Sequence, residues 1–424
     1  QGTADADRQL PDPEEQYLTG IMALNWGGWQ FHWQSVMWEL ETDGPHGGDD
    51  SHHALDLRYQ FEPTPTTELQ FRVSLNQDDT TVADTVGGSV QQGARRAIQS
   101  DTQEASLQWR WQASPRHTWL LGASYTREQT ADGALFPLPV PGLPGLQEIR
   151  FPANNRNYSS LTVQDYFNMS DALTLTLGLR YDYRDDLDQA RLTPRLAAVW
   201  NLAAGHTLKA QYAEGFRAPT FFELLTPDGR QRDLELETVG TTELSYIYRQ
   251  TDWVGRVTLF DSRLGDMVFI RAGDFGNVAR GQAQGIELEW EQQVTSEFKW
   301  QAHVAYVDSK TSRNRAGTLE PEASNSDWLA SVAVWIKPDP HWLLTGRLAY
   351  ASAIDDPTAD VPDQTTLDIT ANVFDIGGYK GLTLRAGIKN LFDEDIHYPL
   401  ALPTNTLVFA FPGRTAWLQL AWDW

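Results

Sequence analysis

The sequence has no cysteine among its 424 residues. This absence excludes a disulfide framework and a thiolate metal site. The sequence also has no uninterrupted apolar run near the roughly 18 residues that a membrane-spanning helix needs. A helical membrane protein is therefore excluded, but a β-barrel is not, because each barrel strand is apolar on one face only.

Positive charge is scarce as well: 33 Lys and Arg stand against 57 Asp and Glu, a net charge of -24. A chain this acidic repels phosphates, so we expect no nucleic-acid partner. Acidic loops suit cations or metal chelates, although they also simply favour solubility. Aromatic residues are plentiful, with 17 Trp, 14 Tyr and 17 Phe, as the interfacial belts of a membrane barrel require.

The dominant pattern is period-two alternation, which predicts strands. In the segment 173–183, leucines and tyrosines alternate with Thr174, Thr176, Gly178, Arg180 and Asp182. About nineteen such segments follow one another, each roughly 9–13 residues long, the length a tilted strand needs to cross a bilayer. The segment 29–40 changes phase near Gln34–Ser35, which predicts a β-bulge there.

Short and long connections alternate along the chain, as in outer-membrane barrels with tight periplasmic turns and long extracellular loops. Short turns are expected near 25–28, 63–66, 114–116, 169–171, 203–205, 250–251, 293–295, 338–340 and 376–380. Long loops are expected at 41–52, 77–100, 129–155, 217–236, 264–280, 311–324, 352–362 and 392–414. A soluble sandwich or propeller also alternates apolar and polar residues, but it does not need this order of loop lengths.

The sequence therefore predicts an all-β protein, a large antiparallel transmembrane β-barrel of about 20–22 strands. Residues 1–15 are expected to form a polar N-terminal segment, and residues 16–424 the barrel. The terminal aromatic Trp424 is expected at the periplasmic rim. Counting strands back from it sends the first strand, Gln16–Leu24, from outside to inside, so we expect a further N-terminal piece.

Four motifs of the second half, in order, resemble those of TonB-dependent outer-membrane receptors. They are the run from Tyr212 to Thr220 (YAEGFRAPT), Asn277 with the Gly285–Leu288 segment (GIEL), the run from Lys389 to Asp395 (KNLFDED), and the run from Phe411 to Arg414 (FPGR). Their Gly, Pro, Asn and Asp residues are turn formers beside strands.

The resemblance implies a barrel around an N-terminal plug, in the outer membrane of a Gram-negative cell. It also implies TonB-driven uptake of a scarce, large nutrient, such as a ferric siderophore, haem or cobalamin. No plug-like segment or TonB box is recognisable. A trimmed chain, a plug on a separate chain and a plug-less pore therefore remain open.

One cluster has metal-ligand chemistry, because imidazoles and carboxylates bind transition metals. Its residues are His46, Asp49, Asp50, His52 and His53, and the alternative interpretation is that they are solvated side chains of a loop. The barrel interior should carry the polar residues of each strand, either lining water or following a substrate path. The candidates are Arg180, Lys209, Glu287, Glu289, Asp368, Arg385 and Lys389.

Apolar contacts at the extracellular mouth are expected from two long loops, and the candidate residues are Phe136, His397, Tyr398 and Phe409. No hydrolase or zinc-helix pattern is present, so neither an enzyme nor a cofactor is expected. The leading hypothesis is an energised nutrient receptor that contacts outer-membrane lipid, lipopolysaccharide and TonB. The alternative is a passive pore or a structural barrel subunit of an envelope complex.

Overall fold

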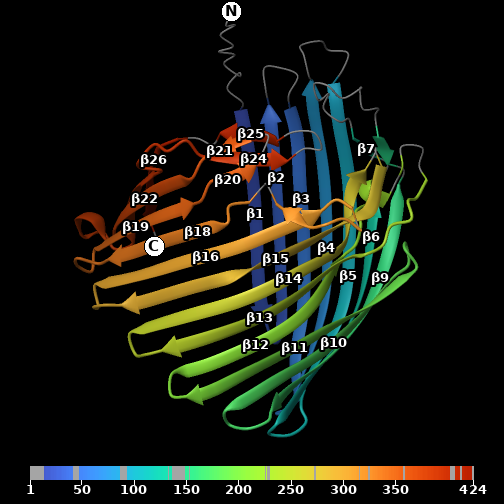
Figure 1. Ribbon diagram of the computed structural model, residues 1–424, viewed down its shortest axis with the longest axis horizontal. Helices are drawn as coiled ribbons and strands as arrows, with labels where there is room; N and C mark the ends of the chain where they lie inside the picture. The colour runs from blue at the N-terminus through green and yellow to red at the C-terminus, as the bar shows by residue number, and fades with distance from the viewer. Residues whose placement is uncertain are drawn as a thin grey trace, which may run out of the picture.

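The computed structural model describes residues 14–41, 47–85, 93–131, 133–135, 149–151, 153–224, 226, 230–271, 274–314, 316–322, 325–356, 359–401, 406–410 and 413–422. Its main sheet contains 22 strands, and nineteen long ones remain when the short β7, β8 and β17 are set aside. Each long strand pairs antiparallel with the next along the chain, and the sheet curls into a barrel (Figure 1). The predicted fold class is confirmed.

The bounds of the long strands are β1 (Glu14–Trp26), β2 (Trp29–Glu41), β3 (Gly47–Thr64), β4 (Thr67–Thr85), β5 (Gly93–Gln112), β6 (His117–Thr130), β9 (Asn154–Asn168), β10 (Leu173–Arg184), β11 (Gln189–Ala203), β12 (His206–Arg217), β13 (Glu237–Arg249), β14 (Trp253–Arg271), β15 (Asp274–Gln293), β16 (Phe298–Ser312), β18 (Trp328–Ile336), β19 (Trp342–Ala351), β22 (Gln364–Val373), β23 (Leu382–Lys389) and β26 (Thr415–Trp422).

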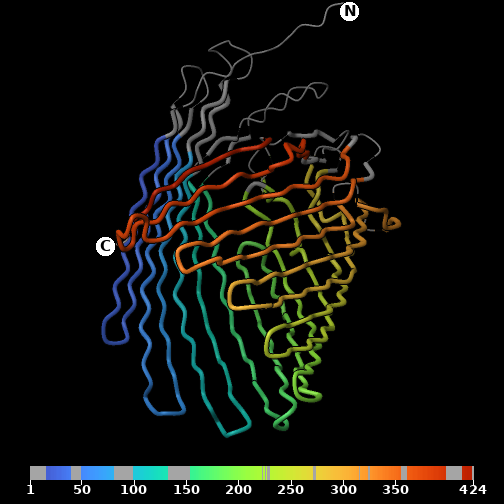
Figure 2. The backbone as a smooth tube through the Cα atoms, turned by 90° about the vertical axis from the view of Figure 1, so that its left-hand side faces the viewer, coloured from blue at the N-terminus to red at the C-terminus, as the bar shows by residue number. Residues whose placement is uncertain are grey.

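Short elements lie in the connections between the long strands. They are β7 (Gly133–Leu135), β8 (Ile149–Phe151), α1 (Phe221–Leu224), β17 (Glu320–Pro321), β20 (Ile354–Asp356), β21 (Ala359–Val361), η1 (Ile376–Gly378), β24 (His397–Ala401) and β25 (Thr406–Ala410). The hairpins β20–β21 and β24–β25 lie together at the end of the barrel that carries the long connections. The tight turns lie at the opposite end, as the tube in Figure 2 shows.

Two sequence predictions about strands are wrong. The segments 41–52, 77–100 and 264–280 were expected to be loops, but most of their described residues belong to β3, β4, β5, β14 and β15. These strands are longer than the roughly 9–11 residues that cross a bilayer, and continued pairing satisfies their backbone groups. The bulge at Gln34–Ser35 is also absent, since β2 pairs with β3 in unbroken register.

Burial is inverted relative to a soluble protein. Buried side chains in the described strands include Thr126, Ser160, Asp182 and Arg184, whereas Leu177 on the other face of β10 is 47% exposed. The polar face of each strand therefore lines the interior and the apolar face points outward, the arrangement of a barrel in lipid. No described helix has both the length and the apolar character needed to span a membrane.

An aromatic belt lies on the outer face at the short-turn end, on strands β2, β3 and β13 to β15. The Trp253 and Trp290 rings stack with centroids 4.3 Å apart, and Tyr248 meets Trp253 edge-on at 4.9 Å. Trp29 and Tyr59 extend the belt on β2 and β3, with centroids 4.5 Å apart. Amphipathic rings of this kind prefer the boundary between lipid and water.

Two tight turns depend on glycine. Gly28 and Gly205 have φ angles of 88° and 79°, a region that L side chains rarely adopt. A Cβ at Gly28 would lie 2.4 Å from the Gln60 carbonyl oxygen, and one at Gly205 would lie 2.4 Å from that of Arg249. The neighbouring strand therefore packs directly against the glycine backbone at both turns.

We predict that Gly205→Ala destabilises the barrel more than Gly378→Ala, as measured by urea unfolding in detergent. Both positions have positive φ, which costs alanine about 1 kcal/mol. Only Gly205 adds a clash, since a Cβ at Gly378 meets nothing within 4 Å. Equal losses of unfolding free energy in the two variants would contradict the close approach.

Candidate functional site

The polar inner wall holds a cavity of about 370 Å³ between β12 and β15, which we call the interior recess. Three of the seven predicted interior residues, Lys209, Glu287 and Glu289, line it together. The sequence placed them on polar faces, and strand pairing brings them side by side. The recess is lined by Lys209, Thr241, Glu243, Ser245, Ile247, Arg256, Thr258, Phe260, Ser262, Glu287 and Glu289.

Strand register arranges these residues in rows across the wall. One row runs from Lys209 through Ser245 and Thr258 to Glu287. The Ser245 and Thr258 hydroxyl oxygens lie 3.0 Å apart and are both buried. Because these side chains are short, the row leaves open space between the charged ends.

A second row carries an ion pair. The Arg256 guanidinium Nη1 lies 2.9 Å from the Glu289 carboxylate Oε2, and His303 on β16 stands opposite Glu289. Above these rows, a Cβ at Gly285 would lie 2.9 Å from the Phe260 ring. The glycine of the GIEL motif therefore makes room for the aromatic wall of the recess.

The other predicted interior residues lie elsewhere on the polar wall. Arg180 Nη2 pairs with Asp182 Oδ1 at 2.8 Å on β10. The Asp368 carboxylate accepts a hydrogen bond of 2.8 Å from the Asn390 backbone N–H, and Arg385 donates to Gln419 at 3.4 Å. Lys389 lies exposed at the end of β23. These four residues do not line the recess.

The four described residues of the predicted metal cluster do not converge on one point. Asp49, Asp50, His52 and His53 lie on β3, where successive side chains point to opposite faces. His52 Nδ1 contacts Asp78 Oδ1 at 2.5 Å, whereas His53 Nδ1 contacts Ser35 Oγ at 2.9 Å. His46 lies outside the described residues.

Among the residues expected at the mouth, Phe136 also lies outside the described residues. Tyr398 and Phe409 are opposite one another in the β24–β25 hairpin. His397 begins β24, where its backbone N–H donates to Gln364 Oε1 at 2.9 Å and its carbonyl accepts from Gln364 Nε2 at 3.0 Å. Gln364 thus ties this hairpin to the start of β22.

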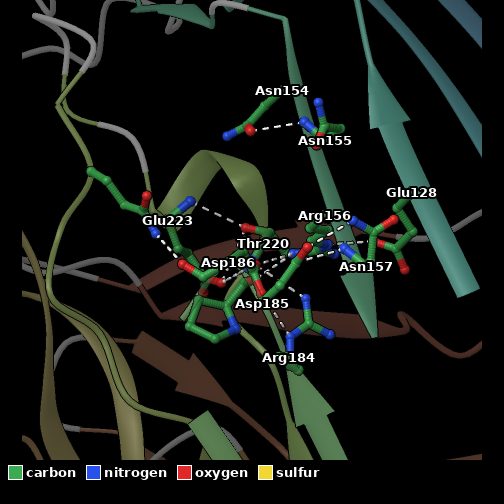
Figure 3. Close-up of polar contacts among 12 residues, drawn as sticks. Glu128, Asn154, Asn155, Arg156, Asn157, Arg184, Asp185, Asp186, Thr220 and Glu223 are labelled. Atoms are coloured by element: carbon green, nitrogen blue, oxygen red, sulfur yellow. Dashed lines mark hydrogen bonds and ion pairs between the residues drawn. The ribbon is translucent and has the colours of Figure 1, made fainter. Parts of the chain in front are cut away.

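The connection after β12 is anchored at the long-loop end, as Figure 3 shows. Arg156 on β9 pairs with Glu128, donates to the Pro219 carbonyl at 2.9 Å, and lies 4.2 Å over the Phe221 ring. Its guanidinium is also 3.8 Å from Asp186. One arginine therefore joins three segments that are far apart in sequence.

The short helix α1 that follows begins with a capping box, in which Thr220 and Glu223 bond reciprocally. The Glu223 backbone N–H donates to Thr220 Oγ1 at 3.2 Å, and the Thr220 N–H donates to Glu223 Oε2 at 2.7 Å. Arg217 Nη1 donates to the same carboxylate at 2.9 Å. Burial alone would raise the pKa of Glu223, but these hydrogen bonds hold that pKa below its usual value.

Helix α1 is part of the connection 218–236, and leucines of this connection pack in a small apolar cluster. Leu224, Leu234 and Val268 are buried there. Asn277 fixes the end of this loop, because its side chain accepts from the Glu235 N–H at 2.8 Å and donates to the Glu235 carbonyl at 2.9 Å. The motif asparagine thus imitates a β-ladder pair.

Asn390 repeats this reciprocal geometry at the end of β23. It accepts from the Glu394 N–H at 2.9 Å and donates to the Glu394 carbonyl at 2.8 Å. Asp393 next to it accepts from the Arg414 N–H at 2.7 Å. The NLFD and PGR motifs therefore meet and close the last long connection at its base.

Sequence reasoning missed Arg256, Glu243 and His303 of the interior wall. Their strands show the same alternation, as Val257 and Leu259 do beside Arg256 and Thr258, so their face was readable. It also missed the capping box, although Thr and Glu three residues apart signal one.

The fold and its polar interior define an outer-membrane β-barrel. Residues 7–391 match the family described as "TonB dependent receptor-like, beta-barrel". The chain therefore belongs to the TonB-dependent receptor family, whose members are outer-membrane transporters and not enzymes.

The relatives share about a quarter of their aligned residues with this chain, over alignments of different length. The chain is 24% identical to the "Iron-regulated outer membrane virulence protein" of Vibrio cholerae, over 90% of this chain and 67% of that protein. It is 25% identical to the vitamin B12 transporter of Photobacterium profundum, over 48% of this chain and 34% of that protein.

Among solved structures, the ferric enterobactin receptor of Pseudomonas aeruginosa superimposes with a TM-score of 0.76 at 15% identity, covering 99% of this chain and 71% of that one. A ferric citrate transporter superimposes with a TM-score of 0.75 at 16% identity, covering 98% of this chain and 71% of that one. At these sequence identities, the structural similarity shows a shared fold only.

We predict that Glu223→Gln loosens residues 218–236 at pH 7, which hydrogen–deuterium exchange measures. Losing the capping carboxylate and its Arg217 pair should speed amide exchange there about fivefold to tenfold. Asp233→Asn, an equal charge change at an exposed position of the same loop, should leave the rates unchanged. Matching exchange rates in the two variants would contradict the clamp, by which we mean the contacts of Glu223 with Thr220 and Arg217.

The same clamp has a defined pH dependence. The folded pKa of Glu223 is lowered relative to about 4.3 in an unfolded segment. Its stabilisation is therefore present above that pH and is lost as the pH falls through the folded pKa. After correction for the intrinsic pH dependence of amide exchange, the exchange rate of residues 218–236 should rise in acid in the natural chain. In Glu223→Gln the corrected rate should not change with pH.

Proposed function

We propose that the chain is the barrel of a receptor that imports a scarce, large nutrient, namely a ferric siderophore or another metal chelate such as haem or cobalamin. The observation that carries the proposal is the charged interior recess inside a barrel whose long connections are anchored by motif residues. A mixed charged wall suits a polar cargo that must bind and then leave. The iron, citrate-iron and vitamin B12 names of the relatives favour this class.

Energy for import would come from TonB, acting through a plug domain. Outer-membrane lipid and lipopolysaccharide would contact the outward face, where Leu161, Leu192 and Leu259 are among the exposed apolar side chains. A passive pore or a structural barrel subunit is the alternative, and the relatives' names as receptors and transporters favour it less.

Uptake by cells tests the proposal. Cells without their own receptors for iron chelates receive the natural gene that encodes this chain, and uptake of labelled ferric siderophores, haem and cobalamin is followed. We expect saturable uptake of one of these that stops when a protonophore collapses the inner-membrane potential. Uptake that is unaffected by the protonophore, together with a large open conductance in planar bilayers, would contradict an energised receptor.

Lys209→Gln should raise the KM of that uptake about fivefold with little change in maximal rate. Lys209 lines the recess, and a cation of this kind contributes about 1 kcal/mol to holding an anionic chelate. Lys380→Gln, in the exposed turn before β23, is the matched control and should leave KM unchanged. An unchanged KM in Lys209→Gln would contradict a role of the interior recess in substrate binding.

A further inference from the structure

Three potential metal ligands converge at the edge of the interior recess. Glu287 and Glu289 are two residues apart on β15, so their side chains share the inner face. His303 on the neighbouring β16 stands directly opposite Glu289. One ligand atom from each of the three residues lies within 4.8 Å of the others.

We propose that Glu287, Glu289 and His303 form a binding site for one divalent transition-metal ion, with Zn²⁺ as the reference ion. One imidazole and two carboxylates are a donor set that such ions accept at neutral pH. The neutral imidazole selects against Ca²⁺ and Mg²⁺, which prefer oxygen ligands only. Water in the barrel interior would supply the remaining ligand.

The side chains have both the room and the freedom to close on an ion. Zinc bonds of about 2.0–2.1 Å place neighbouring ligand atoms about 3.4 Å apart. Since the three ligand atoms already lie within 4.8 Å of one another, they must approach by at most about 1.4 Å. Ala305 faces Glu287 and Ser331 faces His303 across the strands, and both are small. Within the described parts of the chain, neither the Glu287 nor the His303 side chain has a hydrogen-bond or ion-pair partner.

Arg256 controls the charge of the site. Its guanidinium lies 2.9 Å from Glu289, and this charge-assisted contact fixes the carboxylate in orientation. The same positive charge repels a metal ion in this partly enclosed wall. Removing Arg256 should therefore strengthen metal binding, whereas removing any of the three ligands should weaken it.

The site is for a bare cation and does not depend on which nutrient the receptor imports. Zinc binding by the purified 424-residue chain in detergent, with no chelate present, tests it separately from the uptake function. Titration calorimetry with Zn²⁺ and the visible spectrum of bound Co²⁺ report stoichiometry and ligand set. Circular dichroism verifies that each variant retains its β structure.

We expect one Zn²⁺ per chain. Glu287→Gln and His303→Asn should each weaken binding at least about tenfold, and Arg256→Gln should tighten it about threefold to tenfold. Glu243→Gln, a carboxylate of the same recess that is already bonded to Gln211, should change affinity less than about twofold. His341→Asn, at an exposed turn, should have no effect.

Three results would overturn the proposal. The first is no Zn²⁺ binding by the natural chain at millimolar concentration. The second is unchanged affinity in folded Glu287→Gln and His303→Asn. The third is weaker binding in Arg256→Gln, since that would make the arginine a support of the site and not its competitor.

Discussion

The backbone has no water to bond with inside a membrane, and every other feature of this chain depends on that constraint. Each described long strand from β2 to β23 pairs with a strand on both sides, which satisfies backbone groups that lipid cannot. Pairing forces side chains to alternate between lipid and interior, because the pleat has a period of two. Exposed Leu177 and buried Asp182 on one strand are the direct result. The charged recess exists because four neighbouring strands turn their polar faces to the same side.

The family motifs serve the ends of the strands and not the wall itself. Asn277 and Asn390 each imitate a ladder pair at the point where regular pairing stops. Arg217 holds the helix cap that turns the chain away from β12. These contacts order long connections, in whose described residues few apolar side chains, such as Leu224, are buried. They explain why turn and amide residues, and not catalytic ones, define the resemblance.

Alternation is local, so the sequence alone revealed β10 and the polar face of Glu287. Register is not local, and therefore Lys209 and Glu287 could not be placed in one row before β13 and β14 were seen between them. The described histidines of the predicted metal cluster are separated for a related reason. Residues adjacent in a loop can converge, but His52 and His53 lie on a strand that sends them to opposite faces. The ends of the long loops were predicted wrongly because the paired strands are longer than a bilayer requires. In these extensions the apolar and polar residues no longer alternate clearly.

Cysteine scanning is the most direct test of the inward and outward faces, because the chain has no cysteine of its own. Single cysteines are placed at each position of β10, Leu173–Arg184, in the barrel reconstituted in lipid. A membrane-impermeant thiol reagent and a lipid-borne quencher of an attached fluorophore then report on each position. We expect strict alternation, with Thr176 and Arg180 labelled from water and Leu177 and Leu179 quenched from lipid. Labelling without a period of two, or with the two faces reversed, would contradict it.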